Sequence, residues 1–260
     1  MAIFLQKYFC TNNSFLVYNL IAKNLKIRYR GSYVGIFWTV LIPAFTSLVY
    51  YLIFKHVLKV QIENYLVFIM SGLIPWTFFS QTLSSGLETL VSNVSLLNKV
   101  PLPPQSLVLA ETYTNFLNLL FSLPVLFFII LIDKVELNFH MFQYLFFVGL
   151  LFLMANSISL IVSFLYVYFR DLKFLVAIIL QFWFYLTPII YAKTMIPAAY
   201  FYLTYLNPVG ILFVSLHDSI LEPKIISLDY YLVCTGWTLV FFALSILTLS
   251  KFESEVIESL

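Results

Sequence analysis

Residues 83–104 read LSSGLETLVSNVSLLNKVPLPP and lie between two long apolar segments of the chain. Apolar side chains recur here at the three- and four-residue spacing that places them on one face of a helix. That face would consist of Leu83, Leu87, Leu90, Val94 and Leu97. The opposite, polar face would consist of Glu88, Ser92, Ser95 and Lys99. The helix would end at Pro101, Pro103 and Pro104, because proline lacks the backbone N–H and clashes with the preceding turn.

The rest of the chain is dominated by apolar residues. Of its 260 residues, 62% are hydrophobic and only 10% are charged, and the mean hydropathy is +0.97. Soluble domains carry about 25% charged residues, so this composition indicates an integral membrane protein. The net charge of +2 is too small to indicate a nucleic-acid partner. Two cysteines, Cys10 and Cys234, cannot form a disulfide framework and are expected to be free thiols.

Six segments approach the roughly 20 apolar residues that a helix needs to cross a bilayer. They are predicted at residues 34–54, 65–82, 107–132, 142–169, 174–191 and 230–250. The predicted fold is therefore an all-α integral membrane protein with six transmembrane helices in a single domain, 1–260. That domain would comprise a tail and interfacial helix (1–32), a six-span region (33–250) and a C-terminal tail (251–260).

Residues 195–223 are apolar but are interrupted by Pro197, Pro208, Gly210 and Pro223. Each half is about 10 residues long, or roughly 15 Å of helix, which is half of a bilayer core. A re-entrant hairpin on the external side, between the fifth and sixth spans, is predicted. Irregular backbone at membrane depth requires burial in protein or a cavity.

The segment before the first span, residues 13–30, is predicted to be an amphipathic interfacial helix. Its basic side chains are Lys23, Lys26, Arg28 and Arg30. Six spans put both termini on one side, and the excess of Lys and Arg on that side assigns it to the cytoplasm. Residues 1–4 show neither a basic region nor a cleavage site, so no removable signal peptide is expected.

Short motifs also occur in a characteristic order along nearly the whole chain. They are LKIRYRGS (25–32), GIFW (35–38) with Pro43, GLIPW (72–76) with Phe78 and Phe79, NKV (98–100) before a proline, FRDL (169–172), TPIIY (187–191) and NP (207–208). In this order they resemble the ABC-2 type permeases that export polysaccharides, and the O-antigen exporters most. One departure is PLPP (101–104), where relatives more often carry an aromatic-Pro-Arg pattern. The exit from the amphipathic helix is therefore expected to differ.

The resemblance implies an energy source outside this chain. No G-x-x-x-x-G-K-[ST] loop is present, so no ATPase site is expected here, and ATP and Mg²⁺ would bind to a partner ATPase. Two ATPase copies would dock on the amphipathic helix, which would then be a cytoplasmic coupling helix, on the loop at 170–173 and on the basic N-terminal helix. The implied coupling residues are Glu88, Ser92, Ser95, Leu97, Asn98, Lys99, Arg170, Asp171 and Lys173.

The substrate implied by the resemblance is a lipid-linked, O-antigen-like polysaccharide that crosses the inner membrane. Six spans form too small a bundle to enclose a polymer, so a homodimer with the conduit near its two-fold axis is expected. Most of the 28 Phe, 18 Tyr and 4 Trp should face membrane lipid or its interfaces. A minority could pack on sugar rings along a conduit. The candidates are Trp76, Phe79, Phe182, Trp183, Tyr185 and Tyr191.

The sequence contains little that indicates catalysis or metal binding. His56, His140 and His217 are far apart, and no cluster has metal-ligand spacing. Glu111, early in the third span, is costly there unless it is paired, hydrated or extends to the headgroups. Three classes stay open: an ATP-driven polysaccharide exporter, an ion-coupled secondary transporter, and a membrane-embedded lipid- or sugar-modifying enzyme. Capsule and teichoic acid polymers are alternative substrates within the first class.

Overall fold

The computed structural model describes residues 14–57, 59, 62–99 and 102–259. These residues form helices joined by turns and contain no strand, which confirms the predicted all-α fold. In chain order the helices are α2 (Ser14–Arg28), η2 (Gly35–Phe37), α3 (Trp38–Tyr51), η3 (Leu52–Val57), α4 (Tyr65–Ser92), α5 (Val94–Leu97), α6 (Pro104–Ile132), η4 (Phe139–Phe142), α7 (Gln143–Tyr168), α8 (Leu172–Leu186), η5 (Lys193–Met195), η6 (Ala198–Tyr200), α9 (Tyr202–Leu206), α10 (Gly210–Leu221) and α11 (Leu228–Ser259).

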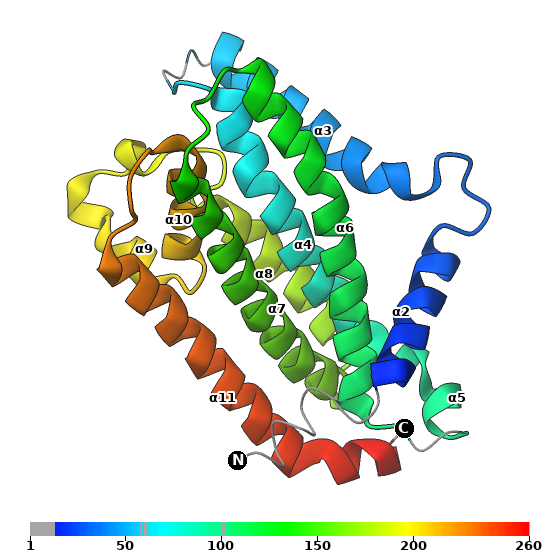
Figure 1. The fold of residues 1–260 in the computed structure, drawn as a ribbon. Helices are drawn as coiled ribbons and strands as arrows, with labels where there is room; N and C mark the ends of the chain where they lie inside the picture. The colour runs from blue at the N-terminus through cyan, green and yellow to red at the C-terminus, as the bar shows by residue number, and fades with distance from the viewer. Residues whose placement is uncertain (1–13, 58, 60–61, 100–101, 260) are drawn as a thin grey trace.

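Helix α4 lies at the centre of the bundle and packs against α3, α6, α7, α8 and α10 (Figure 1). In an 18-residue apolar stretch of α4, 78% of the residues are buried inside the protein, whereas in that of the first span only 11% are buried. The first span therefore lies at the periphery of the bundle. Helices α2 and α5 and the last turns of α11 gather at one end, which we call the α5 end (Figure 1). The opposite end, with the turn at 133–138, is called the far end.

Five helical segments are long and apolar enough to cross a membrane. They are Gly35–Val57, Tyr65–Ser92, Pro104–Ile132, Phe139–Tyr168 and Leu228–Phe252. They match five of the six predicted spans. A sixth is reached if the bent pair Ala198–Leu206 and Gly210–Leu221 counts as one span. This pair bends by 107°, which fits a broken span as well as a re-entrant loop, so the external hairpin stays a prediction.

The amphipathic segment at 83–104 is not one helix, which corrects the prediction. Its first ten residues are the last turns of α4, and the helix breaks at Asn93 before the short α5. The Asn93 side-chain amide donates to the Thr89 carbonyl oxygen (2.9 Å), a local bond of the kind that competes with helix continuation. The predicted apolar face holds on the α4 side, where Leu83, Leu87 and Leu90 are fully buried.

The fifth predicted span, 174–191, also needs correction, because α8 ends at Leu186. Proline disfavours a helical conformation in the residue before it, and Thr187 before Pro188 is extended. Asn207 then donates its amide to the Leu186 carbonyl oxygen (3.3 Å) and to Thr187 Oγ1 (3.1 Å), which ties the α9–α10 turn to the end of α8. At 15 residues, α8 is about 22 Å long and shorter than a bilayer core.

Residues 251–259, expected to be a polar tail, are part of a helix. Helix α11 continues from the last span to Ser259, so the boundary expected at residue 251 is not a break in structure. Cys234 in this helix is a buried free thiol, as expected, whereas Cys10 lies outside the described residues.

Close packing of α4 on α7 depends on Gly86. A Cβ at this position would overlap the Ser159 hydroxyl of α7, and it would lie 3.1 Å from Ser159 Cβ even if the hydroxyl rotated away. Buried Ser159 also donates its hydroxyl to the Thr82 carbonyl oxygen (3.2 Å). Small residues at such a contact let two membrane helices approach closely.

Gly86→Ala is therefore expected to lower the free energy of unfolding by about 1–3 kcal/mol, the usual cost of overpacking. Ser159→Ala in the same chain should recover part of this loss by removing the overlapping hydroxyl. Gly149→Ala on α7 is the matched control, because a Cβ there meets nothing within 4 Å. Denaturant unfolding in detergent provides the measurement, and equal losses for the two glycine variants would contradict this packing.

Candidate functional site

The α5 end presents a surface built from the last turns of α4, α5 and the start of α8. Glu88 Oε1 and Lys173 Nζ are 2.5 Å apart and join α4 to α8. Their side chains are 42% and 56% exposed, so the ion pair contributes little to stability. It does place two of the expected docking elements, the end of α4 and the α7–α8 connection, side by side.

The other candidate coupling residues lie around this pair. The exposed ones are Ser92, Ser95, Asn98, Lys99, Arg170 and Asp171. Leu97 is half-buried and packs on a small apolar cluster that includes Leu90, Leu107 and Val17. The α5 segment thus combines an exposed polar side with an apolar side that rests on α4, α6 and α2.

Helix α2 is attached to α6 by polar side chains. Arg28 donates to Glu111 Oε1 (2.5 Å) and Asn115 Oδ1 (2.7 Å), and Asn24 donates to Glu111 Oε2 (2.9 Å). Lys23 Nζ reaches Asn93 Oδ1 (3.0 Å) at the break between α4 and α5. The other two basic residues, Lys26 and Arg30, are exposed. The structure therefore directs part of the basic face of α2 toward the protein.

Glu111 is the main residue whose role the sequence did not reveal. Its side chain is 13% exposed and forms an ion pair with Arg28, 83 positions earlier in the chain. A signal was present, because Glu111, Asn115, Asn118 and Ser122 recur at helical spacing in an apolar span. Such a stripe predicts a polar face directed into the bundle.

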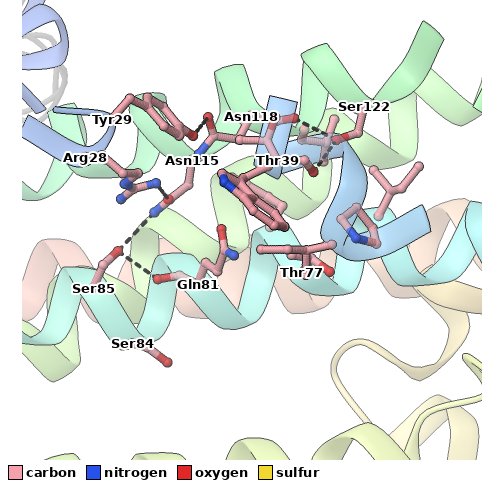
Figure 2. Close-up of a pocket in the computed structure, with 16 residues that line it drawn as sticks. Arg28, Tyr29, Thr39, Thr77, Gln81, Ser84, Ser85, Asn115, Asn118 and Ser122 are labelled. Atoms are coloured by element: carbon pink, nitrogen blue, oxygen red, sulfur yellow. Dashed lines mark hydrogen bonds between the residues drawn. The ribbon is translucent and has the colours of Figure 1, made fainter. Parts of the chain in front are cut away.

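Asn115, Asn118 and Ser122 of this stripe form one wall of a cavity of about 360 Å³ (Figure 2). The other walls come from the end of α2, from α3 and from α4. The polar lining residues are Arg28, Tyr29, Thr39, Thr77, Gln81, Ser84, Ser85, Asn115, Asn118 and Ser122. The apolar ones include Trp38, Ile42, Pro43 and Phe78. Most of the surface inside the cavity is apolar, and its hydroxyl and amide groups supply the smaller polar part.

Hydrogen bonds hold the buried amides of this cavity in place. Asn115 donates to Ser85 Oγ (3.0 Å) while it accepts from Arg28, and Tyr29 donates its hydroxyl to Asn118 Oδ1 (3.1 Å), as Figure 2 shows. Burial raises the pKa of the Tyr29 phenol above its ordinary value, so it keeps the proton that it donates. Ser122 donates to the Thr39 carbonyl oxygen (3.1 Å), which ties α6 to α3.

The candidate conduit aromatics fall into two groups. Trp76 and Phe79 are buried in the core, and the Phe79 ring meets that of half-buried Trp183 edge-on at 5.4 Å. Phe182 and Tyr185 instead lie on the outer face of α8, 66% and 58% exposed. Half-buried Tyr191 follows α8 and donates its hydroxyl to the Tyr185 carbonyl oxygen (3.1 Å). One chain therefore does not bring all six together.

A compact ionic cluster occupies the far end. Lys193 Nζ lies 2.6 Å from Asp218 Oδ2 and 2.7 Å from Glu222 Oε1, and Lys224 Nζ lies 2.5 Å from Glu222 Oε2. Burial alone would raise the pKa of Glu222, but its bonds to both lysines outweigh burial and hold the pKa below 4.5. The stabilisation is therefore complete at neutral pH and is lost as the pH falls through that lowered pKa.

Lys193→Gln is expected to lower the free energy of unfolding by about 3 kcal/mol, because it leaves two partly buried carboxylates without their shared cation. Lys224→Gln is the matched control and should cost about 0–1 kcal/mol, since Lys224 is 67% exposed and pairs with Glu222 only. Thermal unfolding of both variants at pH 7 tests this order, and a larger loss for Lys224→Gln would contradict it.

The long apolar helices and the polar features within them define the class of this chain, a polytopic integral membrane protein. Among the described residues, no group of three or more His, Cys, Asp or Glu side chains could hold a metal ion.

Sequence comparison places the chain within that class. The model of the ABC-2 type transporter family matches residues 16–221, and the chain belongs to this family, as its motifs indicated. Two O-antigen export system permease proteins RfbA from Klebsiella pneumoniae are 31% and 30% identical to it over 237 residues, 89% of this chain and 90% of each relative. An O-antigen export system permease protein RfbA from Myxococcus xanthus is 34% identical over 183 residues, 70% of each chain.

Proposed function

We propose that this chain is the channel-forming membrane subunit of an ATP-driven exporter that moves a lipid-linked, O-antigen-like polysaccharide across the inner membrane. The observation that carries this proposal is the similarity over 89% of the chain to two O-antigen export system permeases. The names of these relatives favour O-antigen over capsule or teichoic acid polymers.

The driving energy would come from a separate ATPase that docks on the α5 end and binds ATP and Mg²⁺ itself. The surface around Glu88 and Lys173 supports this, because it is polar, exposed and connected to the core through Leu97. Basic residues of α2, α5 and the α7–α8 connection lie at the same end, and such residues favour the cytoplasmic side. Both termini would then be cytoplasmic.

A homodimer would complete the conduit. Helix α8 buries only Val176 and Leu180, and its outer face carries exposed Phe182, Tyr185 and Gln181. An amide that faces lipid is costly, so Gln181 supports a polar conduit or a second copy beside this helix. The exposed aromatic rings on the same helix could pack on passing sugar rings.

An ion-coupled transporter fits less well. That mechanism uses intramembrane carboxylates that bind and release ions or protons. Within the described residues, Glu111 is paired with Arg28, and Asp218 is paired with Lys193. Both carboxylates therefore already have cationic partners in this structure.

Co-purification tests the proposal. The tagged full-length chain, extracted from its native membrane in mild detergent, should bring down a protein with a Walker motif, in a complex with two copies of each chain. Lys99→Glu combined with Lys173→Glu should reduce the recovered ATPase, because both changes reverse charge on the docking surface. A complex with one permease copy per two ATPases, or the reproducible absence of a Walker-motif protein, would contradict the proposal.

A further inference from the structure

The cavity between α2, α3, α4 and α6 has the volume of a ligand site. Its volume of about 360 Å³ lies within the roughly 300–1,000 Å³ range of small-molecule pockets. Three of its polar residues are almost fully buried, with exposures of 1% for Asn115, 7% for Asn118 and 3% for Ser122. Buried polar groups are costly in an apolar bundle unless they are satisfied, so this wall is a built feature.

Two exposed side chains at the cavity, Gln81 and Trp38, could bond a ligand in place of water. Within the part of the chain that the structure describes, neither the Gln81 side-chain amide nor the Trp38 indole N–H has a hydrogen-bond partner. The amide supplies two donors and an acceptor, and the indole supplies one donor beside an apolar face. Figure 2 shows Gln81 between the Ser85 side of the cavity and Thr77.

The charge of the cavity decides between possible ligands. Arg28 is the one charged residue among the described lining residues, and its guanidinium is already bonded to Glu111 and Asn115. Its positive charge is therefore compensated, and a phosphate group would have to compete with the Glu111 carboxylate. A mainly apolar lining with hydroxyl and amide groups around a neutralised cation favours an uncharged ligand that has both apolar faces and hydroxyl groups.

We propose that this cavity, between α2, α3, α4 and α6, binds one uncharged sugar ring of the exported polymer inside each subunit. The inference rests on the proposed function and adds a specific subsite to it. Gln81 and the Asn118 side-chain nitrogen would bond the ring hydroxyls, and the apolar face of Trp38 would pack on the C–H face of the ring. A site that bonds hydroxyl groups discriminates strongly against ligands that lack them.

The test uses the full-length chain in nanodiscs, with Cys10 and Cys234 replaced by alanine and Thr77→Cys as a reporter in the cavity wall. The rate of reaction with a water-soluble maleimide is measured while uncharged methyl glycosides of hexoses and 6-deoxyhexoses are titrated. At least one glycoside is expected to slow the reaction threefold or more, in a saturable manner. Inorganic pyrophosphate at equal ionic strength should leave the rate unchanged.

Tryptophan fluorescence of the native chain provides a readout that needs no cysteine. The same glycoside should produce a saturable change, and this change should disappear in Trp38→Phe. Gln81→Leu is expected to weaken binding about tenfold in both assays, because a ring hydroxyl loses its partner. Thr46→Val is the matched control: Thr46 is exposed on α3 and does not line this cavity, so binding should be unchanged.

Two variants test the charge argument. Glu111→Gln should uncover the charge of Arg28 and allow pyrophosphate to slow the maleimide reaction. Arg28→Gln combined with Glu111→Gln removes both charges and should restore the preference for glycosides. The proposal is overturned if no glycoside acts in either assay, if pyrophosphate acts equally well on the unaltered site, or if Gln81→Leu has no effect.

A membrane glycolipid could supply the same sugar chemistry. Nanodiscs with and without glucosyl diacylglycerol separate the two sources. If this lipid slows the maleimide reaction and no free glycoside does, the assignment to the polymer is overturned. None of these assays contains an ATPase. If no glycoside binds but the ATPase still co-purifies, the subsite is refuted and the exporter is not. If a glycoside binds but no ATPase co-purifies, the exporter is refuted and the sugar site is not.

Discussion

Leu97→Asp is expected to leave the protein inserted in the membrane and to abolish export. Leu97 packs on the apolar cluster that supports α5, and an unpaired carboxylate there would cost several kcal/mol. That cost would detach α5 from its support, and a detached segment would not transmit movement of the ATPase to the bundle. Lys99→Glu should cause only a partial loss, since Lys99 is exposed and exposed ion pairs contribute about 0–1 kcal/mol.

Export is measured beside the amount of protein in the membrane for both variants. Ser95→Asp is the matched control, because it adds the same carboxylate to the exposed side of α5. It should cost no more export than Lys99→Glu. Normal export from a stably inserted Leu97→Asp protein would show that α5 is only a connector between α4 and α6.

Arg28→Glu is expected to release α2 from α6 and to reduce both stability and export strongly. The change places two carboxylates side by side where Glu111 is now paired. Loss of the pair should cost about 3 kcal/mol, toward the lower end for a buried pair because Arg28 is 30% exposed. Arg30→Glu, on an exposed neighbour, is the control and should have little effect.

Exchange of the two charges separates the ion pair from other effects of the substitution. Arg28→Glu combined with Glu111→Arg should recover most of the lost stability, because the opposite charges again face each other. The free energy of unfolding of the two single variants and the double variant gives the coupling between the sites. A double variant as unstable as the sum of the single ones would contradict a direct interaction.

The sequence predicted most of the architecture because hydropathy over 20 or more residues is a strong signal in membrane proteins. Spans such as Pro104–Ile132 were found within a few residues. The predicted helix boundary was wrong where a local hydrogen bond ends the helix. The apolar spacing continues through Asn93, but its amide bonds the Thr89 carbonyl oxygen and ends α4 there.

The candidate site was less accessible to sequence reasoning. The motifs led to the α5 end, where Glu88 and Lys173 lie side by side, but they gave no hint of the cavity. That cavity depends on the pair of Arg28 and Glu111, which only the packing of α2 on α6 brings together. The polar stripe on α6 was readable at helical spacing, yet its partners on α2 and α4 were not, because periodicity does not say which helices face each other.

Reconstitution tests the central claim most directly. The purified chain and its co-purifying ATPase are placed in proteoliposomes with the lipid-linked polymer, and transfer of the polymer across the membrane is followed. We predict transfer that requires both chains and ATP, and that stops when the Walker lysine of the ATPase is replaced. Transfer by this chain alone under an ion gradient, without the ATPase, would contradict the account.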